Sequence, residues 1–284
     1  LGTAGGGLLR FDRGRGTAER FGPEPGRVGG LSGNYVWAVH ESTDGTLWVG
    51  TVGGGLDRWL PDRREFRHYR HDPADPGSLG NDNVLCIYEA PSQPGVLWIG
   101  TAGGGLDRFD PATGRFRRYG SDPADAGSLS DNSVAAILEP PGQPGILWLG
   151  TGDGLDRFDT RTERCRRYGR SDGLADTAVA GILPDSLGRI WIGTLRGLSC
   201  FDPKSGRFLN YDAADGLRSG EYNRAACCRT SDGTLYFGGI RGITSFRPED
   251  IAPNPVEPPV ALTAFQVFER GLAQLIGGIA ADQQ

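Results

Sequence analysis

A short phrase of hydrophobic residues, tryptophan and glycine recurs along this chain and limits its fold more than any other feature. Five copies, the first reading LWVGT and the last LYFGG, occupy residues 47–51, 97–101, 147–151, 190–194 and 235–239. A sixth copy is cut by the start of the chain at residues 1–3. The copies lie 43 to 50 residues apart. A repeat of this size with glycine-rich turns is typical of a β-propeller.

Each repeat divides into four expected strands, as the repeat at residues 83–119 illustrates. Its residues 83–88 and 96–100 are apolar runs, which favour inner strands that are buried on both faces. Residues 105–109 and 115–119 alternate between apolar and polar side chains, as outer strands with one wetter face do. Asp-Gly turns such as 44–45 predict tight hairpins between strands. The sequence therefore predicts an all-β fold, a propeller of four-stranded blades with about six repeats visible of a seven-bladed whole.

The repeat also predicts how the blades end and what they bury. All four strands are visible only at residues 34–70, 83–119, 133–168 and 178–211. We therefore expect incomplete first and last blades, whose unpaired edges would make the chain alone poorly soluble or oligomeric. One equivalent position on the second strand holds a tryptophan in four repeats, and we expect all four to be buried: Trp48, Trp98, Trp148 and Trp191.

Composition and charge argue against several classes of protein. A net charge of −5 disfavours nucleic acid as a partner, and the outer-strand arginines alternate with acidic residues as on a solvated face. No run of 18 apolar residues predicts a membrane span, and no signal peptide is visible. The chain lacks methionine and begins within a strand, which predicts a fragment of a longer protein.

No cofactor or metal site is predicted. The five cysteines lack metal-binding spacing, and four of them fall in strands as small hydrophobes would. His68 and His71 should point to opposite faces of a strand and so cannot share a metal ion.

The repeat phrase dG-x-LWvGT-x-gGGLdrfd, followed by loops such as residues 71–79, resembles the two-component regulator propeller repeat. The segments 221–223, 231–239 and 246–251 resemble the closing blade of that family. Residues 258–267 resemble the first strand of the β-sandwich that follows it, the Y_Y_Y domain. The resemblance implies a propeller over residues 1–252, incomplete at its N-terminus. Residues 253–284 would be a linker and the truncated start of the sandwich.

The same resemblance implies function and location. Propellers of this family are extracytoplasmic sensors of hybrid two-component systems, often recognise oligosaccharides, and dimerise. The resemblance therefore implies a non-enzymatic, periplasmic ligand sensor, homodimeric at full length and anchored to the membrane through a segment absent here. Two alternatives stay open: a propeller lyase or hydrolase acting on a glycan or lactone, and a protein-interaction scaffold. Asp57, Asp107 and Asp156 occupy equivalent positions in three repeats, which favours a scaffold role over a single active site.

Candidate ligand-binding residues lie where the repeats differ. A propeller's ligand site usually lies at the mouth of its central channel, framed by the inter-blade loops and the turns between second and third strands. These turns change from glycine alone to turns that carry Asp153, Arg196 and Arg241. Planar guanidinium groups there favour a ligand with carboxylate or sulfate oxygens, an anionic oligosaccharide. The inter-blade loops add the remaining candidates: Tyr35, Asn83, Tyr222, Asn223 and Arg224.

Overall fold

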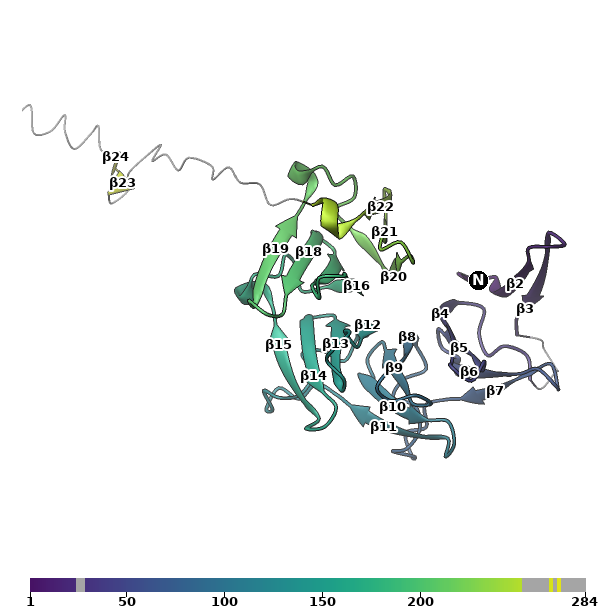
Figure 1. The fold of residues 1–284 in the computed structure, drawn as a ribbon. Helices are drawn as coiled ribbons and strands as arrows, with labels where there is room; N and C mark the ends of the chain where they lie inside the picture. The colour runs from purple at the N-terminus through teal and green to yellow at the C-terminus, as the bar shows by residue number, and fades with distance from the viewer. Residues whose placement is uncertain (24–28, 252–265, 268–269, 272–284) are drawn as a thin grey trace, which may run out of the picture. The chain divides into compact units, whose positions relative to one another are not determined.

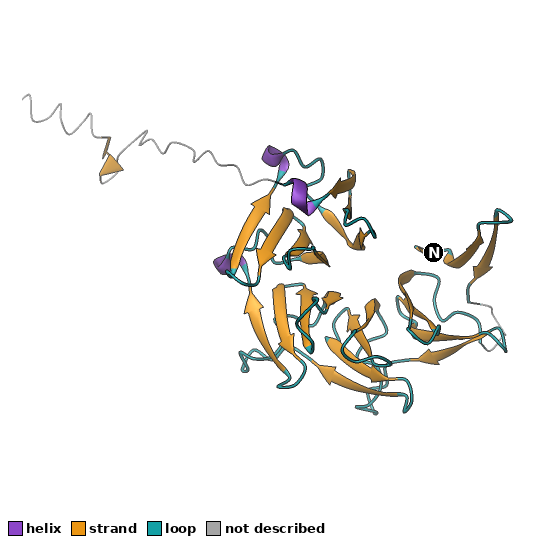
Figure 2. Ribbon diagram, viewed as in Figure 1, coloured by secondary structure: helices purple, strands orange, loops and turns teal. Residues whose placement is uncertain are grey.

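The computed structural model describes residues 1–23, 29–251, 266–267 and 270–271. Strands and turns make up nearly all of this part of the chain, as Figure 2 shows. The chain divides into two units, Leu1–Pro248 and Glu249–Gln284. The predicted linker and sandwich strand at residues 253–284 lie outside the described residues, except for an antiparallel pair formed by β23 (Gln266–Val267) and β24 (Arg270–Gly271).

Within the described residues of the first unit, six antiparallel sheets follow one another along the chain, and we number them blades 1 to 6 (Figure 1). Blade 1 contains β1 (Gly2–Thr3), β2 (Gly7–Asp12) and β3 (Thr17–Phe21), and blade 2 contains β4 (Val36–Glu41), β5 (Leu47–Thr51), β6 (Gly55–Leu60) and β7 (Glu65–Tyr69). Blade 3 contains β8 (Val84–Glu89), β9 (Leu97–Thr101), β10 (Leu106–Asp110) and β11 (Arg115–Tyr119), and blade 4 contains β12 (Val134–Leu138), β13 (Ile146–Thr151), β14 (Gly154–Asp159) and β15 (Arg164–Tyr168). Blade 5 contains β16 (Val179–Pro184), β17 (Ile190–Thr194), β18 (Gly197–Asp202) and β19 (Arg207–Tyr211), and blade 6 contains β20 (Tyr222–Arg229), β21 (Leu235–Gly239) and β22 (Gly242–Phe246).

The predicted β-propeller is confirmed, and so is the pattern of its end blades. Blades 2 to 5 have four strands each, whereas blades 1 and 6 have three in the part of the chain that is described. Three 3-10 helices of one turn complete this part: η1 (Arg170–Asp172), η2 (Ala213–Asp215) and η3 (Pro248–Asp250). None of the described helices is long and apolar enough to cross a bilayer.

The glycines of the repeat serve the turn between the second and third strands. Gly105 has φ +84°, and a Cβ atom added to it would lie 2.2 Å from the carbonyl oxygen of Tyr119 on the neighbouring strand. Only glycine fits such a position, because it tolerates positive φ and leaves room for the adjacent backbone. The same conflict arises at Gly55, where the added Cβ would lie 2.4 Å from the carbonyl oxygen of Tyr69.

The four repeat tryptophans form the contacts that join the blades. All four side chains are buried as predicted, with exposed fractions of 0 to 1%. Each ring packs against a phenylalanine of the next blade, at centroid distances of 4.6 to 5.8 Å: Trp48 on Phe109, Trp98 on Phe158, Trp148 on Phe201 and Trp191 on Phe246. The repeat phrase therefore specifies the core because one aromatic residue per blade fills the same inter-blade space.

Candidate functional site

The inter-blade loops and the turns between second and third strands meet at one end of the blades. The backbone N–H of Gly53 donates to Asn83 Oδ1 at 2.9 Å, and the N–H of Gly55 donates to the carbonyl of Asp82 at 2.9 Å. The same contact recurs between blades 5 and 6, where the N–H of Gly197 donates to the carbonyl of Gly220 at 2.7 Å. The two classes of loop thus frame one surface.

Two of the predicted ligand residues are occupied in holding this frame. The Asn83 side chain accepts a hydrogen bond from the N–H of Gly53 in the turn of blade 2. The Tyr222 side chain is 3% exposed; its ring packs edge-on against Phe237, and its hydroxyl lies 3.0 Å from Thr244 Oγ1. The structure therefore places Tyr222 in the core of blade 6 and not on the surface where it was expected to meet a ligand. Tyr35 is exposed, and its carbonyl accepts from the N–H of Val52.

The three charged turns differ in their surroundings. Arg196 Nε lies 3.6 Å from Asp176 Oδ2, and the same carboxylate oxygen takes a 2.6 Å contact from Arg170. Part of the Arg196 charge is therefore offset within blade 5. The Asp153 side chain is exposed, and its backbone N–H donates to Thr151 Oγ1. Arg241 is exposed at the turn of blade 6.

The inner strand of blade 6 departs from the repeat. In β4, residues 36 and 38 pair with residues 51 and 50, which leaves one extra residue on the inner strand. In β20, Tyr222 pairs with Gly239 and the next pair is Cys227 with Phe237, so three extra residues are accommodated. Residues 223–226 consequently have no partner in the ladder with β21, and Ala225 has a φ of +56°. A non-glycine residue at positive φ is strained, and such strain together with a bulge is typical of functional sites.

The bulge turns Arg224 toward a cavity lined by three inner strands. This cavity of about 230 Å³ is lined by Trp37 of β4, Leu85 of β8, and Arg224 and Ala225 of β20. β20 also lies close to β12, besides packing on its neighbour β16. The cavity therefore sits where the inner strands converge, and its lining combines an indole ring with a guanidinium group.

A second, smaller cavity shares Arg224 with the first. It has a volume of about 90 Å³, and residues of blades 4 and 5, including Ala135, Ala180 and Leu195, complete its lining. We call the two cavities together, with Trp37 and Arg224, the axial site. Because Arg224 lines both cavities, a ligand held by its guanidinium group can extend from one into the other.

Sequence reasoning found Arg224 and missed Trp37. Of the predicted ligand residues, Arg224 alone lines the axial site. The others line neither cavity: Tyr35, Asn83, Asp153, Arg196, Tyr222, Asn223 and Arg241. A signal for Trp37 was present, because the equivalent inner-strand positions of the next three blades hold Leu85, Ala135 and Ala180. The Trp37 side chain is 46% exposed, unlike the four repeat tryptophans.

The buried aspartates of the third strands serve the scaffold, as predicted. Asp57 Oδ2 accepts from the N–H and hydroxyl of Ser32 at 2.9 and 2.7 Å, and its Oδ1 lies 2.6 Å from His68 Nδ1. Asp107 Oδ2 accepts from the N–H of Gly80 at 2.8 Å. Each carboxylate thereby ties the loop that enters a blade to the third strand of that blade. Burial raises the pKa of Asp107 to about 7.

Asp156 repeats this arrangement in blade 4. Its Oδ2 accepts from the N–H of Ser130 at 2.8 Å, and burial raises the pKa of Asp156 to about 6. His71 Nδ1 lies 2.8 Å from the carbonyl of Leu79, so this histidine also holds an entry loop. The described residues contain no cluster of ligating side chains that fits a metal ion.

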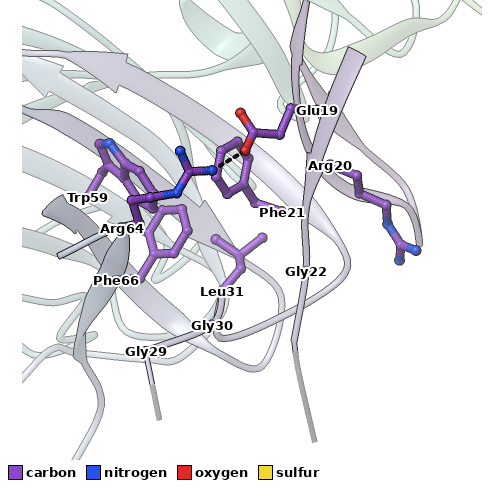
Figure 3. A pocket seen from close by; sticks show the side chains of 10 residues that line it. All are labelled: Glu19, Arg20, Phe21, Gly22, Gly29, Gly30, Leu31, Trp59, Arg64 and Phe66. Carbon is purple, nitrogen blue, oxygen red and sulfur yellow. Dashed lines mark hydrogen bonds and ion pairs between the residues drawn. The ribbon is translucent and has the colours of Figure 1, made fainter. Parts of the chain in front are cut away.

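A further pocket lies between blades 1 and 2, and Figure 3 shows its lining. The guanidinium group of Arg64 reaches across it to an ion pair with Glu19. Beside them the rings of Phe21, Trp59 and Phe66 pack edge-on or tilted, at centroid distances of 4.8 to 6.0 Å. Because Glu19 and Arg64 are paired, Arg20 donates to the carbonyl of Gly6 and the rings are in mutual contact, we assign this pocket to blade packing.

Comparison with known proteins confirms the family resemblance. Residues 30–53 and 173–196 match the family model described as two component regulator propeller. A histidine kinase, P4, of Formosa agariphila is 39% identical over 62 residues, which is 22% of this chain and 4% of the kinase. The extracellular domain of the putative hybrid two-component system BT3049 of B. thetaiotaomicron aligns with a TM-score of 0.71 and 23% identity. That alignment covers 86% of this chain and 31% of the solved extracellular domain, so this chain spans about a third of the length of that domain.

The fold is also shared with an enzyme. A catalytically inactive virginiamycin B lyase of Staphylococcus aureus, solved with quinupristin, aligns with a TM-score of 0.55 and 16% identity over 78% of this chain and 71% of the lyase. At this identity the alignment shows a common propeller fold only, because one fold hosts many activities.

Proposed function

We propose, from the premise that this chain is a two-component regulator propeller, that it recognises a ligand outside the cytoplasm and that the ligand binds at the axial site. The observation that carries the proposal is the bulge of β20, which places Arg224 in two cavities at the cost of a strained Ala225. A strained segment at a cavity is a reason to look for function there. The extracellular origin of the BT3049 domain supports the location.

The chemistry of the axial site favours an oligosaccharide with an acidic group. The indole of Trp37 offers a flat apolar face against which a sugar ring can stack, while Arg224 offers a planar pair of donors for a carboxylate or sulfate. Of the three arginines predicted to meet an acidic ligand, Arg196 already contacts Asp176, which offsets part of its charge. Arg224 and Arg241, both on blade 6, therefore remain as the main positive charges available to the ligand.

The experiment is calorimetric titration of the chain with a neutral and a uronic-acid oligosaccharide of equal length. We expect the acidic ligand to bind and Arg224→Lys to weaken that binding at least tenfold, because lysine cannot reproduce a bidentate contact. Arg229→Lys is the matched control, since Arg229 is exposed on the same strand and lines neither cavity. Tight binding of the neutral sugar that is unaffected by Arg224→Lys would contradict the acidic ligand and leave the sensor role in place.

Trp37→Ala tests the stacking contact in the same titration. Loss of binding to the acidic sugar would support the axial site, whereas unchanged binding would move the ligand elsewhere. Turnover of either sugar by the purified chain would favour the lyase alternative, for which the shared fold is the supporting observation. At full length we propose a homodimer anchored in the membrane through a segment outside this chain, with the propeller passing the ligand signal to output domains.

A further inference from the structure

A groove lies at the opposite end of blade 2 from the axial site. It has a volume of about 730 Å³ and is lined by residues 44–47, 58–63 and 67, which we call the blade 2 groove. These residues belong to the turn between β4 and β5, the end of β6 with the turn that follows it, and β7. Because β5 runs from this turn to the glycine turn near the axial loops, the two sites lie at opposite ends of the strand.

Two arginines face each other in this groove. Arg58 of β6 and Arg67 of β7 are direct partners in the antiparallel ladder, so their Cβ atoms are about 5 Å apart. The Arg58 guanidinium lies 5.6 Å from the centre of the Trp48 ring, and that of Arg67 lies 5.1 Å from the Tyr69 ring. Like charges placed opposite each other destabilise a sheet unless something offsets them.

Protein groups offset this pair only in part: hydrogen bonds from Thr46 lower the pKa of Asp44, and the charge of Arg58 lowers it further. Neither arginine forms an ion pair with a described carboxylate, and the buried Nε of Arg58 has no hydrogen-bond partner in the described part of the chain. A third arginine, Arg63, lines the groove from the turn. The two carboxylates in the lining are Asp44, whose Oδ1 accepts from the N–H of Thr46 in its own turn, and Asp62. The lining of the groove thus carries three guanidinium groups and two carboxylates, which leaves it with a net positive charge.

Blade 3 shows that its equivalent arginines have an acidic partner that blade 2 lacks. Its equivalent pair, Arg108 and Arg117, also faces across the ladder. There, Asp110 ends the third strand; hydrogen bonds from Thr113 and Ala112 lower its pKa, and the charge of Arg108 adds to this effect. Arg117 forms an ion pair with Glu163 of blade 4.

In blade 2 both acids are replaced. The strand ends in Leu60 where blade 3 has Asp110, and Arg67 faces Gly114 where Arg117 faces Glu163. A Cβ added to Gly114 would lie 3.9 Å from the guanidinium group of Arg67, so the acid is missing at the place where it would act. The two substitutions remove both of these acids from the arginine ladder of blade 2, where Asp44 still feels the charge of Arg58 and no described carboxylate forms an ion pair with Arg67.

We propose that the blade 2 groove binds a tetrahedral oxyanion, the phosphate or sulfate ester of a larger ligand. Such a group presents three anionic oxygens, which matches three arginines better than the two oxygens of a carboxylate, and Arg binds these groups in a bidentate manner. Arginines stacked on aromatic rings are also held in place before the anion arrives, which reduces the entropy lost on binding.

The test is calorimetric titration of the chain with inorganic phosphate and inorganic sulfate, at an ionic strength held constant with sodium chloride. We expect saturable binding that is weakened at least tenfold in the variant Arg63→Gln/Arg67→Gln, whose two side chains are exposed and whose loss should not disturb folding. Leu60→Asp restores the acid of the other blades and should have the same effect while every arginine is retained.

The control is Arg108→Gln/Arg117→Gln, which removes the same number of charges from blade 3, at the positions equivalent to Arg58 and Arg67. We expect it to leave binding within twofold of the unmodified chain. Tighter binding of phosphate would assign a phosphate ester, and tighter binding of sulfate a sulfate ester. The absence of saturable binding above the chloride background, or equal weakening by the control, would overturn the proposal. Because no axial residue is altered, this result is independent of the test of Arg224.

Discussion

Replacement of Asp107 by Asn should change how the stability of this propeller depends on pH. The Asp107 side chain is fully buried, and its Oδ2 accepts from the N–H of Gly80. Its Oδ1 is buried without a hydrogen-bond partner among the described residues, and the Nε of Arg118 lies 3.9 Å from it. Burial therefore dominates and raises the pKa of Asp107 from 3.8 to about 7.

The sign of the effect follows from proton binding. Between about pH 4 and pH 7 the folded chain keeps a proton on Asp107 that the unfolded chain releases, so the free energy of unfolding falls as the pH rises through this range. One pKa unit corresponds to about 1.4 kcal/mol, and the shift therefore amounts to roughly 4 kcal/mol. The contribution is fully present below pH 4 and is lost above pH 7.

Asp107→Asn removes the titrating group but keeps an oxygen that can accept from Gly80. We expect the difference in unfolding free energy between the variant and the unmodified chain to shift by roughly 4 kcal/mol in favour of the variant between about pH 4 and pH 8. Urea unfolding followed by tryptophan fluorescence at a series of pH values measures it. For Asp156→Asn, since the pKa of Asp156 is raised to about 6, the shift should be smaller and complete at lower pH. A difference that does not vary with pH for Asp107→Asn would refute the reasoning.

Three further outcomes are expected. Trp148→Ala should lower the free energy of unfolding by about 3–5 kcal/mol, because it empties an inter-blade space; denaturant titration measures the loss, and a near-neutral effect would contradict the packing described. Asp57→Asn should destabilise the chain by at least about 1.5 kcal/mol at neutral pH, because the amide cannot accept from both Ser32 and His68; a variant as stable as the parent would count against the anchoring role. Cys228, which is exposed, should react with a thiol reagent in the folded chain, whereas burial raises the pKa of Cys86 to about 12 and should keep it unreactive until unfolding; equal labelling rates would be inconsistent with this burial.

The repeat alone was sufficient to predict the blades. Strand positions, turn glycines and the burial of the four repeat tryptophans depend on contacts within one hairpin or between identical neighbours, so the same local pattern specifies them each time. The scaffold role of Asp57, Asp107 and Asp156 followed from the same equivalence. Arg224 was predicted as a candidate ligand-binding residue because it departs from the repeat.

The remaining features depend on contacts that no local pattern contains. Tyr222 was expected to face a ligand, and its burial follows from the register of β20 against β21, which the three extra residues set. Trp37 reaches the axial site only because β4, β8 and β20, far apart in the chain, line one cavity. The unpaired arginines of the blade 2 groove become apparent when each blade is compared with the next, since Glu163 neutralises an arginine 46 residues away. Period and turn chemistry therefore determined the scaffold, and the packing between blades decided which of its side chains are free to bind.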